Sequence, residues 1–541
     1  MKQRAAFWLL FSGVIVAALF LRCGDLSFRP LHNDEAINAF KLRKLWSEGA
    51  YRYDPHEYHG PTLYYLSLPV LAVAARFQAA QPDEVSMRSV PLAFGVLLIL
   101  VPLIAVGGLG RSGILFAGLL TAVSPAFVYF SRYYIHELLL VFFSAVFLAG
   151  LWRYRIRPGA GWAAMTGAAL ALMYATKETF VFTLGATACG LMLSVLGPRG
   201  GEITATNAAE TRPGGALTSL GNLLRGVART PWSHVLLLLG VASVVALLFF
   251  TSFFSNPGGA LDALKTYLVW FQRAGGATPH VHPWYFYFQR LVWFRYPGGP
   301  VWSELEILVF AMVGMVAGWR GGVATATRGE VARFLTGFSL SLAAVYAVLP
   351  YKTPWCLLGF HHGLILLAGL GLGVLWEHAR GLASRATIAF VVLGSVVHLG
   401  LESRRASGEF AADFRNPHVY GHTSQDIFNL LEQVRDLAAV HAEGRSMPIE
   451  VVAPDDNYWP LPWYLRDFSR VGWGSEMPVK PTGAVLVVAS KLRSDLEEKS
   501  GGAWIQAGMF ELRPRFFVEV YVESGLWKQF LARRAAPTGS R

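Results

Sequence analysis

Residues 89–109 read SVPLAFGVLLILVPLIAVGGL, and residues 112–130 read SGILFAGLLTAVSPAFVYF. Neither run contains a charged side chain, and only Gly110 and Arg111 separate them. An apolar run of about 20 residues is long enough to cross the hydrocarbon core of a bilayer as a helix. Because lipid offers no water to an unpaired backbone, and because the runs do not alternate, they predict two transmembrane helices.

The same pattern recurs at 7–21 (FWLLFSGVIVAALFL), 234–254 and 356–376. Hydrophobic residues make up 54% of the 541 residues and charged residues only 15%, whereas soluble proteins carry roughly 25% charged residues. The chain is therefore predicted to be a polytopic membrane protein. The first run follows Lys2 and Arg4 as in a signal peptide, but the LRCGD that comes after it is a poor cleavage site, which favours an uncleaved helix.

The basic residues decide which runs span and in which direction. Lys and Arg gather in short segments between apolar runs: 1–4, Arg111, Arg153, Arg155, Arg157, Arg199, Arg212, Arg225, Arg229, Arg320, Arg328, Arg333, Arg380 and Arg385. Such segments face the cytoplasm. This assignment predicts eleven spans with the N-terminus in the cytoplasm, near 6–23, 89–109, 112–130, 137–152, 160–176, 179–196, 234–254, 302–319, 334–350, 356–376 and 386–401. The predicted loops include outer loops 24–88 and 255–301 and a cytoplasmic loop 197–233.

One apolar stretch, 60–79, would reverse every later loop if it spanned the membrane. Pro69 and the Tyr64–Tyr65 pair suit an interfacial position better. The loop 24–88 is therefore predicted to carry two interfacial helices, the first near 34–47 and the second at 60–79.

Residues 402–541 change character, because charged residues become frequent and apolar runs shorten. The pattern predicts helices at 424–442, with Ser424 as its N-cap, at 492–499 and at 526–534, and strands at 449–454, 484–490 and within 509–522. The expected architecture is a transmembrane domain over 1–401, all α-helical, followed by a soluble α/β domain on the extracytoplasmic side.

The net charge of +12 does not indicate nucleic-acid binding. The cations lie in loops between spans, and neither a Gly-rich phosphate loop nor a nucleic-acid module is present in the sequence. No nucleic-acid partner is expected. The three cysteines, Cys23, Cys189 and Cys356, all lie in or beside apolar segments, so they predict neither a disulfide framework nor a metal site.

Under this topology, ionisable residues gather at the outer boundary of the membrane. They occur in LHNDEAINAF (31–40), HEYHGP (56–61), SRYYIHELLL (131–140), ATKETF (175–180) and YKTPW (351–355). Any one of these groups is equally well explained as an ordinary loop residue. Five groups on one face favour a common site, because charges within a membrane are costly.

Carboxylates beside cations at this boundary suit a reaction on a lipid-linked phosphate, in which a carboxylate takes a hydroxyl proton and cations hold the phosphate. The candidate catalytic residues are Asp34, Glu35 and Glu137, with Asp34 as the base. The candidate substrate-binding residues are His59, Tyr64, Tyr65, Arg132, His136, Lys177, Glu178 and Lys352. Asp34, Glu35 and Glu137 are also the candidates for a divalent metal, although no ligand spacing demands one.

These motifs resemble the GT-C superfamily of glycosyltransferases. The resemblance rests on HNDEA after the first span, then HGPTLYY, then RYYxxE, and it is greatest to the branch of dolichyl-phosphate-mannose protein mannosyltransferases and lipid A aminoarabinose transferases. DEA, KET, KTPW, YGHTSQD (420–426) and WPLPWYLRDF (459–468) resemble, more narrowly, a prokaryotic family named after an archaeal flippase-activity-associated protein.

The resemblance implies transfer of a sugar, with inversion, from a polyprenyl-phosphate-linked donor to an unknown acceptor at the outer face of a prokaryotic plasma or inner membrane. It also implies that Asp34 is the base and that Glu137 is a second acidic residue of the site. His136 departs from the mannosyltransferase pattern and leaves the donor sugar open. A packed aromatic core is the favoured explanation of WPLPWYLRDF, with a sugar-binding groove as the alternative.

Two other classes of function compete with an enzyme. A flippase or transporter of a lipid-linked saccharide would place ionisable residues near the middle of its spans, often in two related halves. The predicted spans are almost wholly apolar at their centres and show no repeated half, which favours the enzyme. A non-catalytic subunit of a glycan assembly system is also compatible with the sequence.

Overall fold

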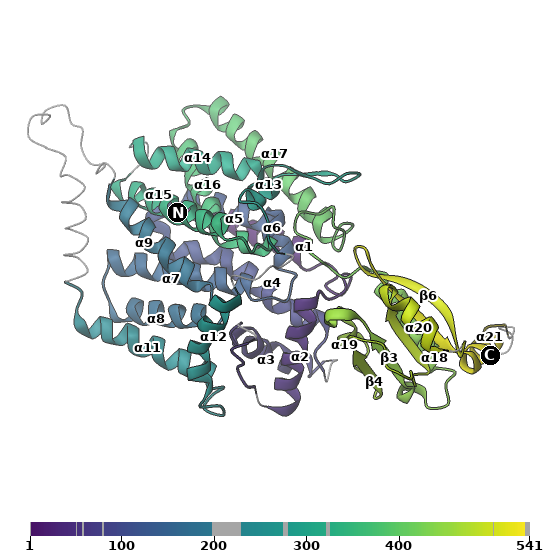
Figure 1. Cartoon of the computed structure of the whole chain (residues 1–541). Coiled ribbons are helices and arrows are strands. Elements are labelled where there is room, and N and C mark those ends of the chain that lie inside the picture. Colours follow the sequence, from purple (N-terminus) through teal and green to yellow (C-terminus); the bar gives the residue numbers. More distant parts are fainter. Residues whose placement is uncertain are drawn as a thin grey trace, which may run out of the picture. The chain divides into compact units, whose positions relative to one another are not determined.

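The computed structural model describes residues 2–49, 51–56, 59–77, 81–196, 229–273, 280–320, 325–500 and 502–535. The chain is mostly helical, with a sheet near the C-terminus (Figure 1). It forms two compact units. Unit 1 comprises Met1–Leu26, Leu42–Glu409 and Arg415–His418, and unit 2 comprises Ser27–Lys41, Phe410–Phe414 and Val419–Arg541.

Each predicted span coincides with helical structure in unit 1. The helices are α1 (Lys2–Arg22), α4 (Glu84–Leu100), α5 (Val106–Val123), α6 (Pro125–Phe130), α7 (Glu137–Ile156), α8 (Ala160–Tyr174), α9 (Phe180–Leu196), α11 (Trp232–Phe250), α14 (Leu305–Arg320), α15 (Ala326–Val348), α16 (Leu358–His378) and α17 (Leu382–Ser407). Most of the predicted cytoplasmic loop 197–233, up to position 228, lies outside the described residues.

Seven helical segments of the described chain are long and apolar enough to cross a membrane. They are Arg4–Arg22, Glu84–Val123, Glu137–Ile156, Trp232–Phe250, Thr327–Val348, Pro354–His378 and Leu382–Ser407. The predicted spans 160–176, 179–196 and 302–319 correspond to the shorter helices α8, α9 and α14, of 15, 17 and 16 residues.

The 40-residue segment Glu84–Val123 contains the apolar run 89–109 and the first part of the run 112–130, whose last residues form α6. A 3₁₀ turn, η1 (Val101–Ala105), and Gly110, with a left-handed φ of +73°, interrupt it. Glycine adopts this conformation without steric cost. The interruption separates α4 from α5, which pack against each other.

Glycines let the long helices approach closely. A Cβ on Gly314 of α14 would lie 2.2 Å from the Leu367 carbonyl oxygen of α16, and one on Gly369 of α16 would lie 2.5 Å from the Ala117 Cβ of α5. Small residues of this kind allow packing between membrane helices, where no hydrophobic effect drives association.

Two helices form in the loop 24–88 where the sequence predicts them. They are α2 (Asn33–Glu48) and α3 (Thr62–Ala74). The 13 residues of α3 extend about 20 Å, too short to cross roughly 30 Å of hydrocarbon. The boundary between the units falls within α2, between Lys41 and Leu42.

Unit 2 contains the predicted α/β domain. Its five-stranded sheet has the order β4 (Val471–Gly474), β3 (Ile449–Val452), β5 (Val485–Ala489), β7 (Phe516–Glu523), β6 (Trp504–Arg513). The strand β3 is parallel to β4 and β5, whereas β7 is antiparallel to β5 and β6. The helices are α18 (Ile427–Ala438), α19 (Leu461–Tyr464), α20 (Arg493–Ser500) and α21 (Ser524–Ala535).

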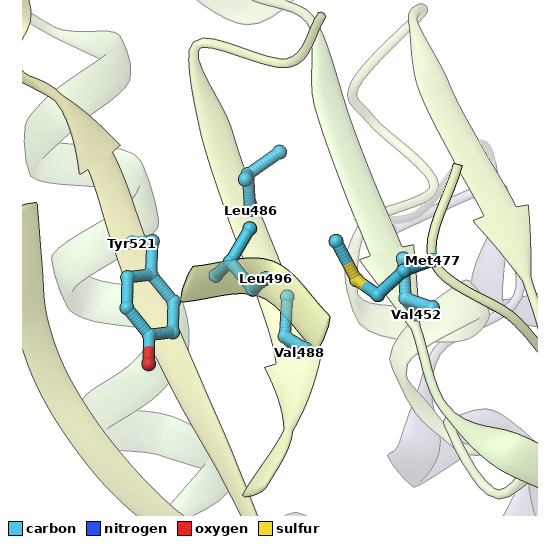
Figure 2. Packing of buried hydrophobic residues seen from close by; sticks show 6 residues of the cluster. All are labelled: Val452, Met477, Leu486, Val488, Leu496 and Tyr521. Carbon is cyan, nitrogen blue, oxygen red and sulfur yellow. The ribbon is translucent and has the colours of Figure 1, made fainter. Parts of the chain in front are cut away.

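Side chains from β3, β5, β7, α20 and the loop between β4 and β5 form a core on the sheet (Figure 2), made of Val452, Met477, Leu486, Val488, Leu496 and Tyr521. The strand material predicted within 509–522 is a hairpin that turns at Arg515, whose φ is +66°. The predicted N-cap was wrong by two residues, because Asp426 precedes α18 and the Ser424 hydroxyl accepts the Asp426 N–H at 3.3 Å.

Candidate functional site

The RYYIHE segment links α6 to α7 and is held along its length. The Tyr133 ring lies 5.7 Å from the Trp355 ring, and the Tyr134 hydroxyl is 2.8 Å from the Ser67 hydroxyl of α3. The His136 Nε2 is 3.0 Å from the Gly60 carbonyl oxygen. All of these side chains are buried. The segment therefore sets the position at which α7 begins, and with it the position of Glu137.

Glu137 accepts a hydrogen bond from the Lys177 ammonium, and the two side chains are only 7% and 8% exposed. Burial by itself lowers the pKa of Lys177, but the charge and hydrogen bond of Glu137, together with Cys356 and Glu178, more than offset this effect and raise that pKa above its ordinary value. The residues therefore form a buried ion pair in which Lys177 keeps its charge.

A second pair lies beside the first. The His59 Nδ1 is 3.3 Å from a Glu178 carboxylate oxygen, and the His59 ring lies 5.1 Å from the His136 ring. The backbone of His59 forms a β-bridge with Lys177. A Cβ on Gly60 would lie 1.9 Å from the Ala175 carbonyl oxygen, so this close approach of HGP to ATKET requires glycine.

The two adjacent tyrosines of α3 have different surroundings. Tyr64 is fully buried, and its ring lies 5.7 Å from His136 and 5.1 Å from Tyr51. Tyr65 instead lies 5.0 Å from the Phe253 ring. It lines a separate apolar groove of about 710 Å³, together with Leu45, Trp46, Leu66, Leu68, Pro69, Ala72, Phe249 and Phe253.

A cavity of about 780 Å³ runs through unit 1 along α7. Glu137 and Lys177 line it at the beginning of α7, and Arg155 and Glu330, which form an ion pair of 2.7 Å, line it near the end of that helix. The 18 residue steps from Glu137 to Arg155 correspond to about 27 Å of helix. Between the two charged ends the lining of α7 is mostly apolar: Leu140, Val141, Ala145, Leu148, Ala149 and Leu151.

Lys352 and Arg132 are the other predicted cations of unit 1. Lys352 is 1% exposed and donates to the Leu349 carbonyl oxygen. No carboxylate oxygen of the described residues lies within 4.0 Å of its ammonium, and burial lowers its pKa. Arg132 donates to the Asp25 carbonyl oxygen at 2.5 Å. Neither residue lines the cavity, although Trp355 and Cys356, close after Lys352, do.

Asp34 and Glu35 belong to unit 2 and differ sharply. Glu35 is completely buried, forms an ion pair with Arg29 at 3.1 Å and accepts the His32 N–H at 3.0 Å. The side chain of Asp34 is 42% exposed, and its nearest ionisable partner is the His32 Nδ1 at 3.9 Å. The first turn of α2 therefore contains one compensated and one accessible carboxylate.

His32 is neutral in this arrangement. Its Nε2 is 3.0 Å from the Tyr420 carbonyl oxygen and donates to it, while its Nδ1 accepts the Asp34 N–H at 3.1 Å. Burial lowers the pKa of His32, although Asp34 and Glu35 oppose the shift. The histidine thus bridges the acidic pair and the YGHTSQD motif.

The two tail motifs hold the segment that bears Asp34. The Thr423 hydroxyl donates to the Leu31 carbonyl oxygen at 2.7 Å, and the Leu31 N–H donates to the Tyr464 hydroxyl at 2.8 Å. The Phe40 ring lies 5.7 Å from Trp459 and 6.2 Å from Trp463, which is fully buried. In WPLPWYLRDF the central residues thus form a packed aromatic core, as the favoured interpretation predicts.

Sequence reasoning missed a buried polar cluster in unit 1. Glu304 accepts from the Ser124 hydroxyl at 2.5 Å and from the Ala126 N–H at 3.0 Å, and it lies 2.9 Å from the His361 Nε2. The anion thereby occupies the N-terminus of α6, which leads into RYYIHE. The prediction missed it because Glu304, at the edge of a predicted span, belongs to no recognisable motif.

Six of the predicted site residues form one contact cluster: His59, Tyr64, His136, Glu137, Lys177 and Glu178. Tyr65, Arg132 and Lys352 have the separate surroundings given above. Among the described residues, no group of three or more His, Cys, Asp or Glu side chains could hold a metal ion.

Comparisons with known proteins bear on the fold. No protein-family model and no curated protein sequence matches the chain. The crystal structure of ArnT from Cupriavidus metallidurans in the apo state is similar, with a TM-score of 0.60 at 14% identity over 97% of this chain and 99% of that chain. The same protein bound to undecaprenyl phosphate gives a TM-score of 0.58 at 14% identity over 96% and 99%.

An oligosaccharyltransferase from Archaeoglobus fulgidus, in a complex with Zn and sulfate, is similar over 96% of this chain and 76% of that chain, with a TM-score of 0.52 and 12% identity. Both relatives are GT-C glycosyltransferases. The chain therefore has the GT-C fold, a polytopic membrane domain with a small C-terminal soluble domain, as its motifs predict.

Proposed function

We propose that this protein is a GT-C-type membrane glycosyltransferase that moves a sugar from a polyprenyl-phosphate-linked donor to an acceptor protein, lipid or glycan at the extracytoplasmic face. The observation that carries the proposal is the cavity along α7, which is apolar over about a membrane-spanning length and ends at the Glu137–Lys177 pair. This combination suits an isoprenoid chain with a charged head.

The cavity supports a lipid donor in two respects. Its apolar side chains would contact the polyprenyl tail, which carries no polar group that burial would leave without a hydrogen-bond partner. Lys177, which lines the cavity and keeps its charge, would attract the phosphate. Lys352 does not line the cavity, but it has no carboxylate partner among the described residues and belongs to the YKTPW segment whose Trp355 lines it, so we propose it as a second cation. The binding of undecaprenyl phosphate by the similar ArnT agrees with this choice of lipid.

Asp34 is the proposed general base, because its carboxylate is the accessible member of the acidic pair. It would take the proton of an acceptor hydroxyl while that oxygen bonds to the anomeric carbon. The bond from the anomeric carbon to the phosphate oxygen would break in the same displacement, so that polyprenyl phosphate leaves with the electron pair. A single displacement inverts the anomeric centre.

Glu35 and Glu137 are proposed to act through their neighbours. Glu35 would orient the turn before α2 through Arg29 and the His32 N–H, and Glu137 would hold Lys177 in place. A divalent metal stays an open part of the proposal. It would have to displace a cation from Glu35 or Glu137, two of its three predicted ligands.

The proposed orientation places the N-terminus in the cytoplasm and the domain predicted at 402–541 outside a prokaryotic plasma or inner membrane. It rests on the Lys and Arg of the short loops. A His56→Cys variant tests it, because this residue is exposed and lies in the predicted outer loop 24–88. A membrane-impermeant thiol reagent should label it in intact cells, and labelling only after permeabilisation would contradict the orientation.

The activity is tested with the purified chain in lipid nanodiscs, a radiolabelled polyprenyl-phosphate hexose and membrane extract from cells lacking the protein as the acceptor source. The expected result is labelled acceptor together with an equal amount of free polyprenyl phosphate. Movement of intact donor across a sealed vesicle without cleavage would identify a flippase instead. No turnover, with the loss of a cell-surface glycan in the deleted strain, would indicate a non-catalytic subunit.

A further inference from the structure

A helix that the sequence did not predict, α12 (Gly259–Arg273), lies in the predicted outer loop 255–301. Leu261, Leu264 and Leu268 are 64%, 63% and 66% exposed. Their spacing of three and four residues puts them in one row along the helix. The row is an apolar surface that the described parts of unit 1 leave uncovered.

The opposite face of α12 is fixed to unit 1. Ala263 and Thr266 are buried, and the Thr266 hydroxyl is 2.7 Å from the Tyr53 hydroxyl. The Tyr267 hydroxyl donates to the Glu178 carbonyl oxygen at 3.3 Å. Because both bonds arise from the same side of the helix, the leucine row faces away from the contact cluster.

The chain reaches α12 from α11, an apolar helix that the described residues leave largely uncovered. Only 6% of the α11 span is buried, and eight residues, 251–258, connect it to α12. The backbone reverses through Ser252, Phe253 and Phe254, all with left-handed φ values of 51° to 71°, and the Ser252 hydroxyl donates to the Tyr51 carbonyl oxygen at 2.5 Å.

Aromatic side chains of the predicted outer loop 255–301 and of the reversal before it are exposed. Phe253 and Phe254 are 53% and 68% exposed, and Trp284 and Tyr285, farther along the same loop, are 66% and 47% exposed. Exposed Trp and Tyr are typical of the boundary between hydrocarbon and headgroups. Helix α12 thus begins shortly after a largely uncovered apolar helix ends, and the exposed Phe253 and Phe254 lie in the connection between them.

We propose that α12 lies in the membrane surface, with Leu261, Leu264 and Leu268 in the acyl-chain boundary and Tyr267 holding the Glu178 loop from above. The occupant of the leucine row is lipid, because α12 packs against α11, an apolar helix of which only 6% is buried, and because amphipathic helices lie in this way at bilayer surfaces. Only the assignment to the outer leaflet rests on the proposed function.

The test uses nitroxide labels at positions 261, 264 and 268, introduced one at a time as cysteines into the full chain with Cys23, Cys189 and Cys356 replaced by Ala. In nanodiscs, collision rates with oxygen, which concentrates in lipid, are compared with those of a water-soluble nickel chelate. A label at Asp467, whose side chain is 59% exposed in unit 2, is the aqueous control.

The three labels should favour oxygen over the nickel chelate by at least about fivefold relative to position 467. Equal behaviour at 264 and 467 would overturn the proposal, and shielding from both reagents would show that protein covers the row. Hydrogen exchange of residues 259–269 in the unlabelled chain gives a second measurement: exchange should be slower in nanodiscs than in a short-chain detergent. Neither measurement requires turnover, so inactivity in sugar transfer would leave the result readable.

Discussion

The predicted carboxylates of unit 1 and unit 2 differ in burial and in their ionic partners. In unit 1, Glu137 and Glu178 are each 7% exposed, and each faces a basic side chain, Lys177 or His59. In unit 2, Glu35 is buried against Arg29, whereas Asp34 keeps 42% of its side chain exposed. Of the four predicted acidic residues, Asp34 alone combines access to water with no direct ion pair to Lys or Arg.

This difference indicates two roles for the carboxylates: the paired ones hold a cation in place, and the exposed one can accept a proton. Burying a carboxylate is costly unless a cation compensates it, and a compensated carboxylate has little tendency to take a proton. The pairs of unit 1 therefore suit the retention of a phosphate-binding cation, whereas Asp34 suits the acceptance of a hydroxyl proton. The predictions below test this division of roles.

The largest effect is expected from Asp34→Asn. An amide cannot take the acceptor proton, so the turnover rate should fall about 10²- to 10⁴-fold. Because the side chain is partly exposed, the free energy of unfolding should change by less than about 0.5 kcal/mol. Sugar transfer and thermal unfolding in nanodiscs measure the two quantities, with the exposed Asp467→Asn as the matched control. Full activity of the Asp34 variant would remove this residue as the base.

The next largest effect is expected from breaking the buried pair of unit 1. Lys177→Met leaves Glu137 buried without its cation and should destabilise the protein by about 3–5 kcal/mol. The double variant Lys177→Met/Glu137→Leu removes both charges and should recover most of this loss. Thermal unfolding of the two variants in the same detergent provides the measurement. A double variant as unstable as the single one would show that packing, and not charge, dominates here.

Glu35→Gln tests the other half of the acidic pair. It removes the charge that compensates Arg29 and weakens the bond to the His32 N–H, so the expected loss of stability is about 1.5–3 kcal/mol. Asp34→Asn, the isosteric change one residue earlier, is the control. The proposed division of roles would be wrong if Glu35→Gln left stability unchanged and reduced turnover as strongly as Asp34→Asn. Glu35 would then be the better candidate base.

Much of the membrane unit could be predicted from the sequence, because hydropathy and the positions of Lys and Arg act locally. Local sequence was enough to predict two helical segments at 89–109 and 112–130 and to single out the motifs RYYIHE and ATKETF. The contacts that each residue of a motif makes were harder to predict. Tyr64 and Tyr65 are neighbours, yet a step of about 100° around the helix sends one ring to His136 and the other to an apolar groove.

Long-range contacts were beyond a local analysis. The Leu31 backbone is held by Thr423 and Tyr464, which are 392 and 433 residues away in the sequence, so no periodicity near HNDEA could indicate them. The strand β4 was missed because its sequence, VGWG, is half glycine and carries no apolar run. The leucine row of α12 was missed because the segment lies inside the predicted outer loop 255–301 and contains no long apolar run. Its apolar residues recur with the helical period, but they are separated by polar residues.

Tyr464→Phe is expected to have a smaller effect on stability. It removes only the hydroxyl that accepts the Leu31 N–H, so the free energy of unfolding should fall by about 0.5–1.5 kcal/mol. The turnover rate should fall as well, because the segment that bears Asp34 loses an anchor. Tyr458→Phe, whose hydroxyl bonds Asp456 at the exposed surface, is the control. Equal effects of the two changes would contradict an anchoring role for Tyr464.

The smallest effect concerns His32, which is buried and neutral beside Asp34. Burial lowers its pKa in the folded protein, with Asp34 and Glu35 opposing that shift and Arg29 and Arg513 assisting it. An unfolded chain takes up the proton near pH 6.5, so acid favours unfolding. The stability contributed by neutral His32 should therefore be complete above about pH 6.5 and should decline below it, by at most about 0.7 kcal/mol between pH 7 and pH 6.

Unfolding of the wild-type chain and of His32→Gln at several pH values measures this effect. The variant should lose the part of the pH dependence that lies below pH 6.5, while the exposed His56→Gln should keep it. If His32→Gln retained the whole pH dependence, the neutral histidine would not link the acidic pair to Tyr420. The accessible state of Asp34 would then have to come from the ion pair of Glu35 and the anchors on Leu31 alone.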